Sequence, residues 1–422
     1  MKIKQLLFTH CATGNGFDPE KSSCYQIKAM SDNLDNLPLL SEWSAHLGQT
    51  VYSYSPEIAR KNEAEWLKTT ENVADGVPEA VLSNFPVIWT YRKLGPELYS
   101  LTRTSYIGLT RDRRSAPGNF LTNTLVFPSS ILGSPPGNPL GLISAVAFQI
   151  DPDTIEAGPL PTLETFGADI ENECDTKILG QSDFEAQLPA LLSAVFMSRD
   201  RPLVICLRDA SEAVPLLAAL LQVLPPGLRC TTTFTTHSHD PCWPGTDSND
   251  PNPARIPNQI TIISTHGSDS KGPQPDEPRL RHLQVFNFVS GRFPEAIPVS
   301  AFGKFAADCI QRNIPKPLET YHRAAFALGC DGSVTDCDRL VSIFTPSSTS
   351  GVIERLIERL QILVPLVWTK TGAECAFQLV EAKLKELGAA GFDKAEIPLA
   401  QLLSSIWSAP EPSKENSLPG GI

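Results

Sequence analysis

Stretches of β-branched and aromatic residues typical of β-strands occur only in the first 290 residues of this 422-residue chain. They alternate there with turn residues and with apolar runs at helical spacing, whereas only helical spacing remains after Gly291. The length also exceeds that of one ordinary domain. We therefore predict an α+β N-terminal domain over residues 1–160, a three-layer α/β middle domain over 161–292, an all-α C-terminal domain over 293–409 and a disordered tail over 410–422.

The order of the predicted elements differs between the first two domains. In the N-terminal domain, strands are expected over residues 3–9, 24–31, 51–54, 86–94, 105–109 and 120–127. In the middle domain, helices over 184–197 and 211–224 alternate with strands over 203–207, 231–236 and 259–264. Such alternation is typical of a buried sheet with helices on both faces.

The composition argues against two classes of partner. The chain has 47 acidic and 35 basic residues and a net charge of −12, which repels a phosphate backbone, so general nucleic-acid binding is not expected. The apolar runs are far shorter than the roughly 20 residues that span a bilayer, so no membrane association is expected. The first residues lack the apolar run of a secretory signal, and the ten cysteines form no close CxxC pairs. We expect a cytoplasmic protein whose cysteines are mostly buried and reduced.

The predicted binding site is a basic loop between two N-terminal strands. It places three guanidinium groups within four residues on a short connection, where the strands would hold them rigidly. An acidic residue among them can orient the guanidinium groups, while a glycine and an asparagine shape the turn. The residues of this site are Arg111, Asp112, Arg113, Arg114, Gly118 and Asn119, with Asn123 on the following strand. The loop predicts contact with an anion or an acidic partner, and the alternative is a solvated hairpin loop.

The sequence lacks the common motifs for nucleotide binding and hydrolysis. The first glycine-rich segment carries Glu20 where a P-loop needs a glycine before Lys21. No GxGxxG follows a strand and no GxSxG occurs, so no cofactor is predicted. The alternative function is a thiol-dependent hydrolase or another enzyme with its site near His10, Cys11 and Cys24, although a lone histidine at a strand end is usually structural.

A zinc site is a further alternative, in the segment 230–242. Cys230, His237, His239 and Cys242 carry suitable ligand atoms, but their spacing lacks a CxxC or HxxxH pair. Alternate residues of an extended strand also point to opposite faces. The pattern therefore favours a strand that runs into a polar loop, without a metal.

Several short segments, in order along the chain, resemble those of one known family. They are Gln5 with Cys11, the run 25–29, the span 106–126 with its Pro117-Gly118-Asn119-Phe120, the run Leu224-Pro225-Pro226, the run 232–236 and Asp240-Pro241. Together they resemble the N-terminal and middle domains of the GTPase-associated protein family of bacterial NTP-dependent conflict systems, over residues 1–290.

This resemblance implies a protein that is encoded with a GTPase and effector modules. It implies a non-enzymatic adaptor or regulator that couples the GTPase to the effectors of a bacterial, antiviral defence system, with both as its partners. Relatives often carry histidine where Asn123 stands, and asparagine can form hydrogen bonds but cannot shuttle a proton near neutral pH. An arginine of the basic loop could then contact the phosphates or the acidic surface of the GTPase. The remaining alternative is a purely structural module of a larger assembly.

Overall fold

The computed structural model divides the chain into two compact units, which are described separately. It describes residues 2–21, 24–34, 36–53, 85–109, 117–148, 156–164, 176–238, 259–264, 272–295, 297–344, 360–366, 370–387, 401–402 and 404. The first unit comprises Met1–Asp175, Ser198–Leu221 and Thr232–Ala296, and the second comprises Thr176–Met197, Gln222–Thr231 and Ile297–Ile422. The basic loop from Arg111 to Arg114 and the predicted tail lie outside the described residues.

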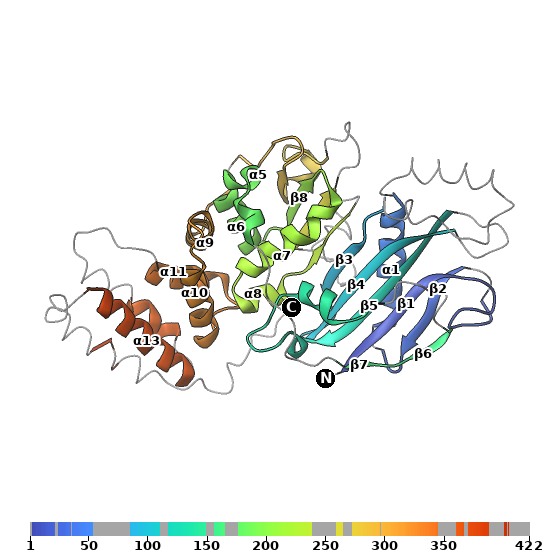
Figure 1. The fold of residues 1–422 in the computed structure, drawn as a ribbon, viewed down its shortest axis with the longest axis horizontal. Helices are drawn as coiled ribbons and strands as arrows, with labels where there is room; N and C mark the ends of the chain where they lie inside the picture. Colours follow the sequence, from blue (N-terminus) through green and yellow to red (C-terminus); the bar gives the residue numbers. More distant parts are fainter. Residues whose placement is uncertain are drawn as a thin grey trace. The chain divides into compact units, whose positions relative to one another are not determined.

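The first unit is built on one mixed β-sheet (Figure 1). Its strands follow the order β11-β8-β10-β9-β3-β4-β5-β1-β2-β6, and β7 pairs with β1 beside this path. The strands are β1 (Lys2–Cys11), β2 (Cys24–Ser31), β3 (Ile88–Lys93), β4 (Leu98–Leu109), β5 (Pro117–Pro128), β6 (Gly158–Leu160), β7 (Leu163–Glu164), β8 (Leu203–Leu207), β9 (Phe234–Thr235), β10 (Ile260–Ser264) and β11 (Gln284–Asn287).

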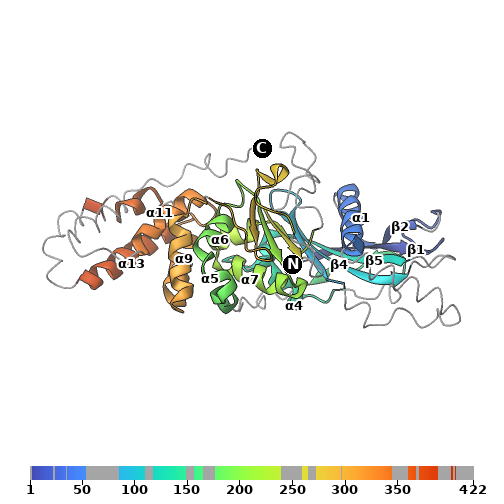
Figure 2. The same ribbon diagram turned by 90° about the horizontal axis from the view of Figure 1, so that it is seen from above.

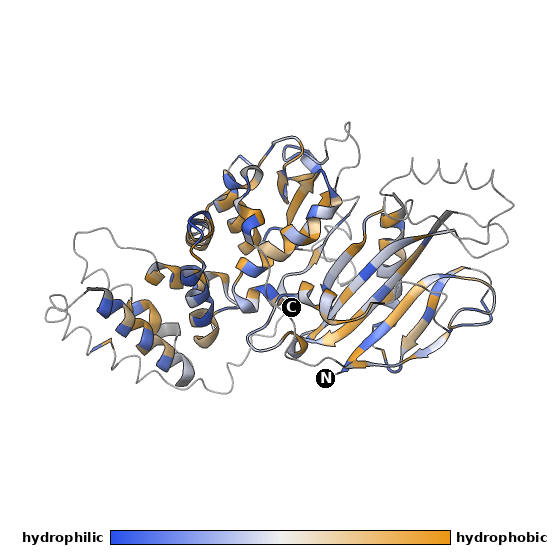
Figure 3. Cartoon of the chain, in the orientation of Figure 1, coloured by the Kyte–Doolittle hydropathy of each residue, from blue (hydrophilic) through white to orange (hydrophobic). Residues whose placement is uncertain are grey.

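The two halves of this sheet differ in strand direction. The N-terminal strands β1 to β5 pair antiparallel, whereas β8 to β11 form a parallel group. Antiparallel pairing of β9 with β3, which sets Phe234 opposite Tyr91 and Thr235 opposite Thr90, joins the halves. All five residues of β8 are buried, and they are coloured as hydrophobic in Figure 3. This fits the expectation that parallel strands are apolar on both faces.

The helix α1 (Leu37–Ser53) covers one face of the antiparallel half (Figure 2). Its Leu40 and Trp43 form a buried cluster with Leu6, Phe8 and Phe120 of the strands. Burying such side chains removes apolar surface from water and so stabilises the helix on the sheet. Further short elements of this unit are η2 (Ser129–Leu132), η3 (Pro139–Gly141), α4 (Leu142–Ala145), η6 (Ala210–Glu212) and η8 (Pro278–Leu280).

The second unit is helical in its described residues. It contains η5 (Thr176–Gly180), α5 (Ser182–Glu185), α6 (Leu188–Phe196), α8 (Pro226–Thr231), α9 (Ala301–Gln311), α10 (Pro315–Ala327), α11 (Val334–Phe344), η9 (Gln361–Leu366) and α13 (Lys370–Leu387). The helix α7 (Ala213–Val223) crosses the boundary between the units along the chain. In the core, α6 and α9 pack closely because Gly303 leaves room for the Ser193 side chain.

The predicted class of a mixed α/β protein with a helical C-terminal region is confirmed. The difference from the prediction lies in the sheet, because strands assigned to two domains share one sheet through the β9–β3 pairing. The strand expected over residues 231–236 is also shorter, since α8 extends to Thr231 and β9 holds only Phe234 and Thr235. At residues 51–53 the expected strand is wrong, because these residues form the end of α1. Among the described residues, no helix has the length and apolar character needed to cross a bilayer.

Candidate functional site

The strands that flank the predicted basic loop form a long antiparallel pair. β4 and β5 pair from Leu98 with Pro128 to Leu109 with Pro117, so the loop is the connection of a hairpin, as the sequence predicts. Gly118 and Asn119 belong to β5 rather than to the turn. Asn119 is buried, and its side-chain oxygen lies 3.4 Å from the hydroxyl of Thr9 on β1. The role of the four loop residues stays a prediction.

The residues of the predicted thiol site lie on the β1–β2 pair. The register sets Cys11 opposite Cys24 and His10 opposite Tyr25. Because neighbouring residues of a strand point to opposite faces, the imidazole of His10 does not share a face with the thiol of Cys11. The ring of His10 instead packs edge-on against Tyr25, with ring centroids 5.2 Å apart. The strand geometry therefore brings the two cysteines together and separates them from the histidine.

The alternative zinc site has two candidate ligands within the described residues, and these two lie on different elements. Cys230 lies in α8 of the second unit, His237 follows β9 in the first unit, and His239 and Cys242 lie outside the described residues. The Nδ1 atom of His237 accepts the backbone N–H of Ser264 at 3.4 Å, so this nitrogen is already engaged. The described part of the chain holds no group of three or more His, Cys, Asp or Glu side chains that could bind a metal ion.

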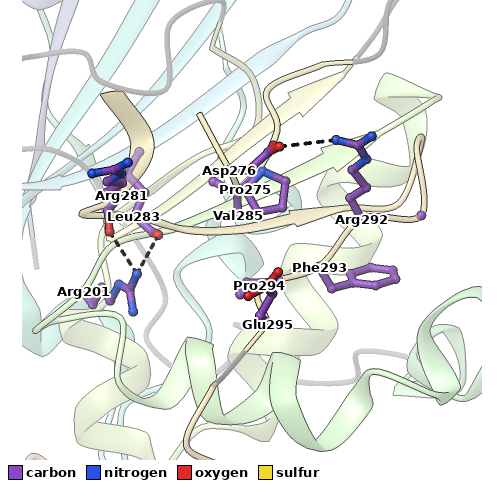
Figure 4. A pocket seen from close by; sticks show the side chains of 11 residues that line it. Arg201, Pro275, Asp276, Arg281, Leu283, Val285, Arg292, Phe293, Pro294 and Glu295 are labelled. Carbon is purple, nitrogen blue, oxygen red and sulfur yellow. Dashed lines mark hydrogen bonds and ion pairs between the residues drawn. The ribbon is translucent and has the colours of Figure 1, made fainter. Parts of the chain in front are cut away.

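A pocket of about 700 Å³ lies beside β11, the strand at one end of the sheet path (Figure 4). Three separate segments build it: Arg201, which lies two residues before β8, the stretch from Pro275 into β11, and residues 291–295 after β11. Its lining consists of Arg201, Pro275, Asp276, Arg281, Leu283, Val285, Gly291, Arg292, Phe293, Pro294 and Glu295. The pocket therefore combines an apolar wall with three guanidinium and two carboxylate groups.

Hydrogen bonds fix one wall of the pocket around Arg201. Its Nη2 atom donates to the carbonyl oxygen of Arg281 at 3.0 Å and to that of Leu283 at 3.3 Å, as Figure 4 shows. In return, the side-chain amide of Gln284 donates to the carbonyl oxygen of Arg201 at 2.8 Å. Arg201 therefore serves mainly to hold the chain that enters β11.

The other two arginines present their charge to solvent. Arg292 and Asp276 form an exposed ion pair, with 3.6 Å between nitrogen and oxygen. Arg292 is held in place by its backbone, which exchanges hydrogen bonds of 2.9 and 3.1 Å with Asn287. Arg281 is exposed, and its guanidinium has no hydrogen bond or ion pair among the described residues. This side of the pocket can therefore accept a carboxylate or another anion.

The lining of the pocket contains no histidine, cysteine, serine or lysine, and its acid–base groups are the carboxylates of Asp276 and Glu295. Apolar side chains next to exposed guanidinium groups suit the docking of a partner segment with an acidic side chain. Sequence reasoning missed this pocket because Arg201 and Arg281 are 80 positions apart in the sequence. Only the pairing of β11 with β8 brings them together.

Fold and site together define a mixed α/β protein with an arginine-lined surface pocket. Comparison with family models gives a more specific classification for the middle of the chain. Residues 175–289 match the GTPase-associated protein 1 middle domain. This confirms the resemblance noted for the middle part of the sequence. The match contains six of the eleven residues that line the pocket, from Arg201 to Val285; it does not include Arg292 and Phe293, nor β1 to β5. The searches of curated proteins and of solved structures found no match.

Proposed function

We propose that this protein is a non-enzymatic adaptor that couples a GTPase to effector proteins of a bacterial conflict system. The observation that carries this proposal is the match of residues 175–289 to the GTPase-associated protein 1 middle domain, a family whose name refers to association with a GTPase. The net charge of −12 also supports a protein as the partner, because an acidic surface disfavours binding of nucleic acid.

The arginine-lined pocket is the proposed docking site for the GTPase. Arg281 and Arg292 are exposed cations on an otherwise acidic chain, so they offer a local attraction for an acidic segment. Guanidinium groups bind carboxylates through two parallel hydrogen bonds, which adds orientation to the attraction. The apolar side chains of Leu283, Val285 and Phe293 can then bury apolar contacts of the same segment.

The proposal is tested by a pull-down of the GTPase encoded beside this chain, loaded with GDP or with a non-hydrolysable GTP analogue. We expect the intact protein to bind one nucleotide state more strongly, because an adaptor has to sense that state. The double variant Arg281→Ala/Arg292→Ala should weaken binding by at least about tenfold at physiological salt, in line with the loss of two exposed charge contacts.

A matched control is Arg312→Ala, which removes an exposed arginine that is paired with Asp308 in the second unit. This variant should bind like the unaltered protein. The double variant Arg113→Ala/Arg114→Ala tests the basic loop separately. If the unaltered protein binds the GTPase in neither nucleotide state, the adaptor function is wrong. If only the loop variant loses binding, the pocket is not the docking site.

A further inference from the structure

A second polar cluster lies on the antiparallel half of the sheet, on the face opposite α1. The register of β4 and β5 sets Arg103 directly opposite Asn123, so both side chains lie on one face. Phe120, which packs against Trp43 of α1, is an odd number of positions from Asn123 and so points to the other face. The cluster therefore does not belong to the core beneath α1.

Asn123 is fully buried, and neither polar atom of its side-chain amide has a hydrogen-bond partner among the described residues. Each unpartnered buried polar group costs about 1–3 kcal/mol of folding free energy, and such groups are rare in native proteins. An asparagine at the centre of a sheet, between β1 and β4, therefore has a cost that packing alone does not explain.

Arg103 has a similar shortage of partners. Its Nη1 atom donates to the hydroxyl of Ser105 at 2.9 Å, and no carboxylate of the described residues forms an ion pair with it. Burial lowers the pKa of Arg103, which reflects the cost of keeping a cation in a poorly hydrated place. By contrast, Arg292 is exposed and paired with Asp276. Arg103 thus has several donors ready for an anion and remains partly exposed to solvent.

We propose that Arg103 and Asn123 bind an oxyanion, a carboxylate or phosphate group of a small ligand. Directly opposed side chains of an antiparallel pair begin about 4.5–5.5 Å apart at their Cβ atoms, so one oxyanion can accept hydrogen bonds from both. The guanidinium provides the charge and the access from solvent, and the Nδ2 atom of Asn123 provides a second donor. Ser105 holds the guanidinium in position through its hydroxyl. This site is separate from the proposed docking pocket and does not depend on the adaptor function.

The test titrates the full chain with sodium phosphate and, separately, with sodium acetate, at constant ionic strength maintained with sodium chloride. Binding is followed by calorimetry and by the NMR signal of the Asn123 side-chain amide. We expect one of the two anions to bind and to shift this signal. The anion that binds more tightly distinguishes a phosphate ligand from a carboxylate ligand.

Three variants make the test specific. Asn123→Leu should weaken anion binding at least about tenfold and raise the Tm without ligand, because it removes two unpartnered polar atoms. Arg103→Lys keeps the charge and should preserve the fold but weaken binding, since an ammonium group lacks the planar fork. Arg339→Gln removes an exposed arginine paired with Asp336 and should leave binding unchanged.

Three results would overturn the proposal. The first is that neither anion binds the unaltered chain, and the second is that Asn123→Leu and Arg103→Lys both bind the anion with unchanged affinity. The third is a Tm that falls in Asn123→Leu, because that would mean the amide has protein partners that stabilise it.

Discussion

The Nε2 atom of His322 lies 2.8 Å from the carbonyl oxygen of Val223, the last residue of α7. The final carbonyl groups of a helix have no partner within the helix, and Pro225 and Pro226, which follow here, have no N–H to donate. Arg229 donates to the two neighbouring carbonyl oxygens, of Gln222 at 2.9 Å and of Leu224 at 3.0 Å. Two basic side chains therefore satisfy three consecutive carbonyl groups at the end of this helix.

The first prediction concerns acid sensitivity. Burial, with a smaller contribution from the charge of Arg229, lowers the pKa of His322 from 6.5 to about 3. Between these two pH values the unfolded chain binds a proton at His322 that the folded chain does not. The contribution of neutral His322 to the free energy of unfolding is therefore fully present above pH 6.5 and is lost as the pH falls towards 3. We expect His322 to contribute a slope of at most about 1.4 kcal/mol per pH unit to the free energy of unfolding. The variant His322→Gln keeps an N–H donor but cannot be protonated in this range. Its free energy of unfolding, measured by urea denaturation, should therefore fall less steeply between about pH 7 and 5 than that of the unaltered protein. Parallel curves for the two proteins would contradict the prediction.

The second prediction concerns Arg229, which is buried. Arg229→Met removes the donors to two carbonyl groups and should lower the free energy of unfolding by about 2–3 kcal/mol. It also removes a positive charge near His322, so the pKa of that histidine should rise in an NMR titration. The control Arg312→Met breaks only an exposed ion pair and should cost less than about 1 kcal/mol. An unchanged pKa of His322 would be inconsistent with the role given to Arg229.

The third prediction concerns a pair of buried threonines on the face of the sheet that α1 covers. The hydroxyl oxygens of Thr102 on β4 and Thr124 on β5 lie 3.0 Å apart. Thr102→Val leaves the other hydroxyl buried without this partner and should cost about 1–2 kcal/mol, whereas the double valine variant should be within about 1 kcal/mol of the unaltered protein. A double-mutant cycle from chemical denaturation measures this coupling. If the destabilisation of the double variant equals the sum of the two single-variant values, the hydrogen bond between Thr102 and Thr124 does not stabilise the protein.

The fourth prediction concerns the contact between α1 and the sheet. A methyl group on Gly48 would overlap the ring of Phe120. Gly48→Ala should therefore destabilise the first unit, because an overlap cost of about 1–3 kcal/mol exceeds the gain in helix propensity. Gly95→Ala is the matched control, since its added methyl meets only Leu98 at an ordinary distance of 3.7 Å. The Tm of both variants is measured by thermal unfolding. If Gly48→Ala has the same Tm as Gly95→Ala, Gly48 is not closely packed against Phe120.

Local pattern predicts much of the secondary structure of this chain. The hairpin around the basic loop, the apolar strand β8 and the helices after residue 297 follow from β-branched runs, turn residues and helical spacing. The short β9 was overestimated because the run 231–236 is rich in threonine, while the preceding proline pair starts a helix instead. Helix contacts with distant residues can override a weak strand preference.

The candidate sites could be predicted only in part. The family resemblance drew attention to Asn123, whose role stays a prediction, but Arg103 was not singled out, because the register of β4 and β5 is needed to set the two residues opposite each other. The arginines of the pocket are equally scattered along the chain. Their charge is visible in the sequence, but their proximity is not.

By itself, the sequence determined where strands give way to helices, and which nucleotide-binding and hydrolase motifs are missing, because these features depend on neighbouring residues. The tertiary structure alone decided that β9 joins β3 in one sheet, that Arg103 faces Asn123, and that Arg201, Arg281 and Arg292 line one pocket. The physical reason is that strand pairing and register are set by packing between residues far apart in the chain, which local preferences do not encode.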